Sequence, residues 1–192
     1  DSFEHYYSLY QRRNLDLWAE YADGKVTKEE LNRQRYLYPL EAVGAGDSTL
    51  AKAYERDALT MIPTKSKLMP HAREVLEYLS GKYNLYILSN GFKELQSHKM
   101  RSSGIDEYFK KVVLSDDIGI LKPWPEIFHF ALSTTQSELN NSLMIGDSWE
   151  NDIVGAAGVG MHQVFYNLSG RTDLPFAPTY QITDLKDLFN FL

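Results

Sequence analysis

Three short segments of the sequence carry residue types that could together bind a phosphorylated ligand. In the first, Ser89 and Asn90 can donate hydrogen bonds to anionic oxygens, and Gly91 allows the backbone to approach a ligand closely. In the second, Lys122 offers an ammonium group for the same oxygens. These four residues form a predicted phosphate-binding group.

The third segment supplies carboxylates. Asp147 and Asp152 are hard oxygen donors of the kind that Mg²⁺ binds, and their charges would be costly to hold together without a cation. Each segment alone has an ordinary structural explanation, because Ser-Asn-Gly is common in turns and an aspartate often lies in the first turn of a helix. The prediction depends on all three segments following expected strands.

The elements that must position these residues are expected from Pro63 onward. Short apolar runs predict strands at residues 83–88, 111–114, 142–145, 162–166 and 180–182, with helical segments between them. Repeated strand–helix alternation predicts a doubly wound parallel sheet that is covered by helices on both faces. Ligands of such sheets lie beyond the carboxyl ends of the strands, which is where the three segments fall.

The first 62 residues have a different pattern. Apolar residues recur there at three-to-four spacing, and no run resembles a buried strand. Thr27 and Glu30 have the spacing of a helix capping box, and Gly44–Ser48 marks a break before another helical stretch. We therefore expect an α/β chain in two parts, a helical block over residues 1–62 and an α/β core over residues 63–192.

Together, these motifs resemble the haloacid dehalogenase superfamily. Ser89-Asn90 is similar to its second motif, Lys122-Pro123 to its third, and Gly146-Asp147 with Asn151-Asp152 to its fourth. The resemblance implies a Rossmann-like core with residues 1–62 as a helical cap. It also implies an aspartyl-phosphate intermediate, catalytic roles for Ser89 and Lys122, Mg²⁺ on Asp147, and Asp152 as a further ligand or a group behind the ligands.

One motif of that family is absent. Its first motif is a strand ending in Asp-x-Asp, which supplies the nucleophile and the general acid, yet no two aspartates of this sequence lie two residues apart. The strand expected in the middle of the sheet is also missing, as is the carboxylate expected beside Lys122. We expect an N-terminal segment with this strand to be lacking from the sequence; the alternative is a catalytically inactive relative.

The expected activity is Mg²⁺-dependent hydrolysis of a small phosphomonoester. The stretch from Ser89 to Gln96 resembles the pyrimidine 5′-nucleotidase branch, which makes a nucleoside 5′-monophosphate the leading substrate. Alternatives are a sugar-phosphate or pyrophosphate hydrolase, a haloacid dehalogenase, and a non-catalytic phospholigand-binding relative. The two carboxylates argue against the dehalogenase, which needs no metal.

Composition excludes other classes of protein. The chain has 192 residues and no cysteine, so disulfide scaffolds, thiolate zinc sites and cysteine nucleophiles are excluded. The net charge of −6 argues against a nucleic-acid polymer as partner, and no stretch approaches the roughly 18 apolar residues of a membrane helix. We expect a cytoplasmic enzyme with a small phosphorylated substrate; the sequence does not indicate its oligomeric state.

Overall fold

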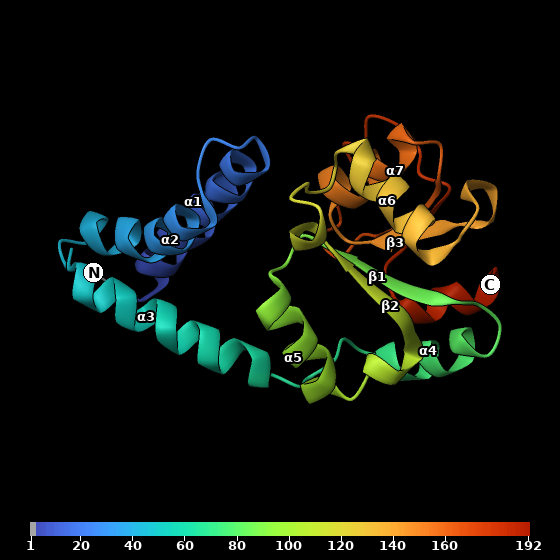
Figure 1. Ribbon diagram of the computed structural model, residues 1–192, viewed down its shortest axis with the longest axis horizontal. Helices are drawn as coiled ribbons and strands as arrows, with labels where there is room; N and C mark the ends of the chain where they lie inside the picture. Colours follow the sequence, from blue (N-terminus) through green and yellow to red (C-terminus); the bar gives the residue numbers. More distant parts are fainter. Residues whose placement is uncertain (1–2) are drawn as a thin grey trace. The chain divides into compact units, whose positions relative to one another are not determined.

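The first part of the chain forms three α-helices. In the computed structural model, which describes residues 3–192, they are α1 (Phe3–Ala22), α2 (Lys28–Ala42) and α3 (Ser48–Met61) (Figure 1). Helix α2 begins where the capping pattern predicts, because the Thr27 hydroxyl accepts a hydrogen bond of 3.1 Å from the Glu30 backbone N–H. The Asp47 carboxylate caps α3 in the same way through Thr49, at 2.7 Å.

The three helices share a core of their own. Tyr36, Leu37 and Leu40 of α2 pack with Ala51 of α3, and partly buried tyrosines of α1 complete the cluster. This helical unit ends at Thr64, and a second unit comprises Lys65–Leu192. The sequence places the boundary after residue 62; residues 1 and 2 of that block lie outside the described part of the chain.

The second unit alternates strands with helices. Its strands are β1 (Leu85–Ser89), β2 (Phe109–Leu114), β3 (Leu143–Gly146), β4 (His162–Tyr166) and β5 (Tyr180–Ile182). Its α-helices are α4 (Ala72–Ser80), α5 (Lys93–Ser103), α6 (Pro125–Thr135) and the short α7 (Gly155–Gly158). A π-helical segment, Trp149–Val154, leads into α7, and a 3₁₀-helix, Leu185–Asn190, follows β5. The strand–helix order agrees with the sequence prediction.

All the strand pairs in the described residues are parallel, but they form two sheets instead of one. Strand β1 pairs with β2, from Leu85 opposite Phe109 to Ser89 opposite Leu114. The second sheet has the order β3-β4-β5. Among the described residues, β1 and β3 therefore each have a strand partner on one side only.

Nevertheless, β1 and β3 belong to one layer. Leu85 of β1 and Leu143 of β3 both pack against the core cluster that α4 forms with β4 and β5. Leu88 of β1 and Met144 of β3 pack on the opposite side, against the cluster that contains Ile127 and Phe128 of α6. The two strands share helical cover on both faces, as a doubly wound sheet requires, although no hydrogen bond joins them in this part of the chain.

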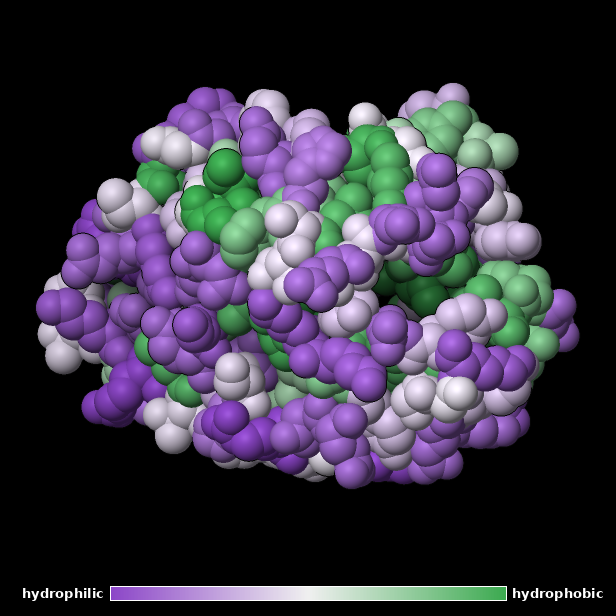
Figure 2. All heavy atoms as spheres, turned by 45° about the vertical axis from the view of Figure 1, so that its right-hand side comes forward, coloured by the Kyte–Doolittle hydropathy of each residue, from purple (hydrophilic) through white to green (hydrophobic). Residues whose placement is uncertain are grey.

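The exposed surface is mixed in character. The face drawn in Figure 2 is mainly hydrophilic, with hydrophobic side chains visible in separate areas. Among residues 3–192, no helix is both long enough and apolar enough to cross a membrane.

Candidate active site

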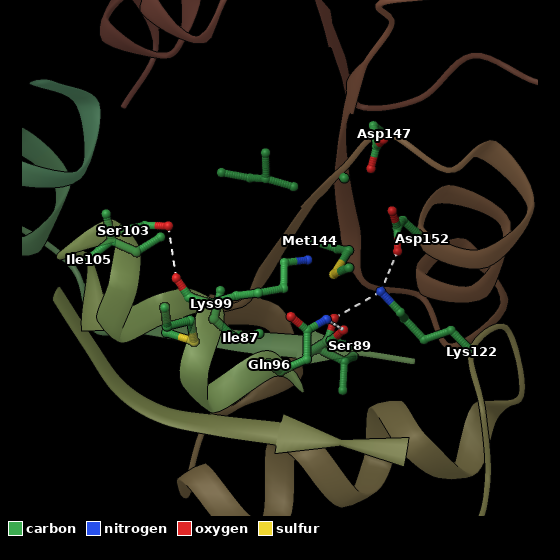
Figure 3. Close-up of a pocket in the computed structure, with 14 residues that line it drawn as sticks. Ile87, Ser89, Gln96, Lys99, Ser103, Ile105, Lys122, Met144, Asp147 and Asp152 are labelled. Atoms are coloured by element: carbon green, nitrogen blue, oxygen red, sulfur yellow. Dashed lines mark hydrogen bonds and ion pairs between the residues drawn. The ribbon is translucent and has the colours of Figure 1, made fainter. Parts of the chain in front are cut away.

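A cavity of about 360 Å³ in the α/β unit contains most of the predicted site residues. It lies between β1 and β3 and is closed on one side by α5 (Figure 3). Three predicted segments meet there, as expected for residues at the carboxyl ends of parallel strands. The side chains that line it are Ile87, Leu88, Ser89, Gln96, Lys99, Met100, Ser103, Ile105, Lys122, Met144, Ile145, Asp147 and Asp152, with Gly146.

A buried ion pair forms the polar floor of this cavity. The Lys122 ammonium lies 2.6 Å from Oδ1 of Asp152, and their side chains are only 10% and 6% exposed. The same ammonium donates to the backbone oxygen of Leu88 at 2.8 Å. Because an ammonium group has three donors, one N–H of Lys122 remains available for a ligand. The expectation that Lys122 has no carboxylate partner in this chain is thus wrong: Asp152 is that partner.

The π-helical segment sets the position of Asp152. Oδ2 of Asp152, the oxygen that does not contact Lys122, accepts a hydrogen bond of 3.0 Å from the backbone N–H of Ser148. Gly146 permits this arrangement, because a Cβ atom there would collide with the Asp152 side chain. Both carboxylate oxygens of Asp152 therefore accept a hydrogen bond from the protein.

The Asn90 side chain has a structural contact that the sequence does not predict. Its Nδ2 donates to the backbone oxygen of Lys122 at 3.0 Å, and its Oδ1 accepts from the Lys122 backbone N–H at 2.7 Å. This double hydrogen bond fastens the Lys122 loop to the end of β1. One of the two N–H groups of Nδ2 remains unused by these contacts, so the Asn90 side chain could still donate to a phosphate oxygen.

The Ser89 hydroxyl, in contrast, faces the cavity. Its oxygen accepts one hydrogen bond from the backbone N–H of Gly91, at 3.0 Å, and a second from Nε2 of Gln96, at 2.7 Å. Gln96 belongs to the stretch from Ser89 that resembles the nucleotidase branch, but the sequence alone assigns it no role. Its spacing in the sequence is the signal that could have indicated this contact. Gln96 lies four residues after Phe92, in the first turn of α5, the helix that directly follows the Ser89 segment.

Asp147 is the carboxylate that remains free to hold a cation. It is exposed at the cavity and has no hydrogen bond or ion pair among the described residues. Over that part of the chain, no group of three or more histidine, cysteine, aspartate or glutamate side chains could by itself hold a metal ion. The donor set fits Mg²⁺, which usually binds through one or two carboxylates and completes its shell with water and substrate phosphate.

The structure thus brings together four of the six predicted residues. Ser89, Lys122, Asp147 and Asp152 line the cavity, whereas Asn90 and Gly91 lie directly beside it without lining it. A hydroxyl, an ammonium group and two carboxylates at one strand edge can bind a phosphate group together with a divalent cation.

The chain is similar in sequence and in fold to known hydrolases. The model of the haloacid dehalogenase-like hydrolases matches residues 1–160. The pyrimidine 5′-nucleotidase YjjG of Escherichia coli is 30% identical over 185 residues, which cover 95% of this chain and 80% of YjjG. The magnesium-bound crystal structure of the HAD-hydrolase YfnB from Bacillus subtilis superposes with a TM-score of 0.89 at 27% identity, covering 99% of this chain and 83% of that one.

The same fold also carries another chemistry. The 2-haloacid dehalogenase of Pseudomonas syringae superposes with a TM-score of 0.66 at 24% identity, covering 99% of this chain and 80% of that one, a likeness that concerns the fold alone. Family membership is established by the match of the family model and by the sequence identity with YjjG. The chain belongs to the haloacid dehalogenase-like hydrolases, an enzyme family with a Rossmann-like core.

Proposed function

We propose that this hydrolase is a Mg²⁺-dependent phosphatase that cleaves small phosphomonoesters, with a nucleoside 5′-monophosphate as the leading substrate. The observation that carries the proposal is the buried Lys122–Asp152 pair beside Asp147, in one cavity; within residues 3–192 the Asp147 carboxylate has no partner. A site for an uncharged or singly charged ligand has no need of a cation-binding carboxylate next to an ammonium group. A phosphate dianion with a divalent cation matches this charge arrangement.

In this proposal the phosphate is held by groups at the ends of β1 and of the Lys122 loop. Ser89 would donate its hydroxyl hydrogen to one oxygen, and Asn90, which follows it directly, would donate to another. Lys122 contributes the N–H that Asp152 and Leu88 leave unused. Because Asp152 holds the ammonium group at 2.6 Å, the charge is already in place before the substrate arrives, which lowers the cost of stabilising the transition state.

Asp147 would be the direct protein ligand of Mg²⁺, and Asp152 would support the site through Lys122 and Ser148. Mg²⁺ bound there would neutralise charge on the phosphate oxygens as the bond to the leaving group breaks.

The nucleophile would come from a strand between β1 and β3. Two observations support this part of the proposal: both strands have an unpaired edge among the described residues, and their side chains share core clusters on both faces. A carboxylate oxygen at the end of that strand would form a bond to phosphorus while the bond to the leaving alkoxide breaks. Water would then hydrolyse the aspartyl-phosphate.

The helical unit would act as the cap that selects the leaving group, and residues 63–192 as the catalytic core. The nucleoside 5′-monophosphate is favoured over other phosphomonoesters because YjjG, a pyrimidine 5′-nucleotidase, is 30% identical over 95% of this chain. A sugar phosphate, pyrophosphate or haloacid substrate, or phospholigand binding without turnover, would each give a different result in the same assay.

The test is a substrate panel assayed with the full-length protein. Nucleoside monophosphates, sugar phosphates, pyrophosphate and a 2-haloacid are incubated with Mg²⁺ or with EDTA, and released phosphate or halide is measured. We expect Mg²⁺-dependent phosphate release, fastest with a pyrimidine nucleoside monophosphate. Halide release that EDTA does not affect would identify a dehalogenase, and binding of inorganic phosphate without turnover of any compound would identify a non-catalytic relative.

A further inference from the structure

We propose that Gln96 is a positioning residue that orients the hydroxyl of Ser89 as a hydrogen-bond donor toward the ligand in the cavity. This inference rests on the proposed function, since it assigns a task to a neighbour of the phosphate-binding hydroxyl. Gln96 itself does not need to touch the substrate.

The hydrogen bonds around Ser89 carry the argument, and Figure 3 shows the one from Gln96. A serine hydroxyl has two acceptor positions and one donor hydrogen. The Gln96 amide donates to Oγ at 2.7 Å and the Gly91 backbone N–H donates to it at 3.0 Å, so both acceptor positions are filled. The hydroxyl hydrogen must then point away from both donors, and within the described chain Ser89 donates it to no protein atom. A ligand in the cavity is the acceptor that this arrangement leaves.

Phosphate oxygens are acceptors, so a hydroxyl fixed as a donor is matched to them. Without Gln96, the hydroxyl could rotate and accept a hydrogen bond from water or from a neighbouring ammonium group. Fixing the direction of the Ser89 hydroxyl would then reduce the free energy of ligand binding. Gln96 avoids this cost because it orients the hydroxyl before the ligand binds.

The glycine at position 91 is explained by the same contact. A Cβ atom on Gly91 would lie 2.8 Å from Cδ of Gln96 and closer still to Nε2, a separation that real Cβ atoms do not show. The backbone of Gly91 is not in the left-handed region, so conformation does not demand a glycine there. A larger residue there would displace the Gln96 side chain from its present position.

The experiment measures kcat and KM of the full-length protein with p-nitrophenyl phosphate and Mg²⁺, together with the affinity for inorganic phosphate by calorimetry. For Gln96→Leu we expect kcat/KM to fall about three- to ten-fold, the range of one neutral hydrogen bond, with phosphate binding weakened similarly. His98→Ala, an exposed change on the same helix, should have no effect. A Gln96→Leu protein with wild-type kinetics would overturn the inference.

Two further variants separate positioning from a purely structural role. In a Ser89→Ala background, Gln96→Leu should cause no further loss, because its effect passes through the hydroxyl. An equal loss in both backgrounds would mean that Gln96 only supports the fold. Gln96→Glu should be more impaired than Gln96→Leu at neutral pH, since a carboxylate would accept the Ser89 hydrogen, and should recover relative to wild type at acidic pH, where a protonated carboxyl can donate again.

Gly91→Ala supplies an independent check. Alone, it should lower kcat/KM at least as much as Gln96→Leu, because it displaces the Gln96 side chain; combined with Gln96→Ala, which removes the collision, it should add nothing. Additive losses would contradict the inference. If the wild-type protein showed no turnover, the proposed function would fail, and the calorimetric comparison would still decide the role of Gln96; a wild type that does not bind phosphate would refute both.

Discussion

The buried Lys122–Asp152 pair permits a quantitative prediction about stability. Its charged atoms are 2.6 Å apart and the side chains are only 10% and 6% exposed. Removing one member of such a pair leaves an uncompensated charge in the interior, which costs about 3–5 kcal/mol. Asp152→Asn preserves the shape of the side chain, but its amide has one oxygen for the two donors that the carboxylate accepts from, Lys122 and Ser148. Lys122 keeps its 2.8 Å hydrogen bond to Leu88. We therefore expect a loss within this range, about 3–5 kcal/mol.

Urea unfolding followed by fluorescence measures this loss. In a background with Trp18→Phe and Trp124→Phe, the signal comes from Trp149, which is 4% exposed and packs edge-on against Phe165 in the α/β unit. EDTA is added so that bound metal does not contribute to the stability of the folded state. The matched control is Glu74→Gln, which breaks the exposed pair with Lys186 in the same unit and should cost less than about 0.5 kcal/mol.

A double variant tests the electrostatic reason for the loss. Lys122→Met with Asp152→Leu replaces both charges by apolar groups of similar size, so its stability should return to within about 1–2 kcal/mol of wild type, although activity is lost. The reasoning would be refuted if Asp152→Asn were as stable as the control, or if the two single losses simply added in the double variant.

Three other changes have definite expected outcomes. Asp147→Asn should abolish Mg²⁺-dependent turnover while leaving the urea midpoint unchanged, because this exposed carboxylate has no partner in the described chain; an unchanged rate would remove Asp147 from the site. Gly146→Ala should destabilise the α/β unit by about 1–3 kcal/mol, measured by the same unfolding assay, since its methyl group would collide with Asp152. Burial raises the pKa of Tyr36 from 10.0 to about 12, so the folded state keeps a proton that the unfolded state loses, and stability should fall as the pH rises through this window. Tyr36→Phe should remove that part of the decline, at most about 2 kcal/mol, when the unfolding of both proteins is compared at pH 9 and pH 11.5; parallel pH profiles would show that Tyr36 is not responsible.

Much of the fold could be predicted because it depends on local patterns. The strand from His162 to Tyr166 agrees with the apolar run that predicts it, and the capping residue Thr27 correctly marks the start of α2. Ser89, Lys122 and Asp147 could be proposed as a group because each follows a predicted strand, and parallel strands end at the same edge. The cap role of the helical unit and the metal-binding role of Asp147 remain predictions.

The pairings within the site could not be predicted in the same way. Lys122 and Asp152 are 30 residues apart and come from different elements, and no periodicity indicates that their side chains meet. The Asn90 amide looks equally suited to a phosphate or to a backbone segment; only the packed position of the Lys122 loop decides between them. Gln96 likewise acquires its contact with Ser89 because α5 turns back over the end of β1.

By itself, the sequence determined the order of strands and helices, the family resemblance and the segments that carry the chemistry, because these depend on residue types and short spacings. Only the tertiary structure decided which hydrogen-bond donors and acceptors pair in the site and which carboxylate remains free for a cation. It also showed that β1 and β3 share a layer without pairing in the described residues. The physical reason is that a buried polar group takes whichever partner packing brings within hydrogen-bonding distance.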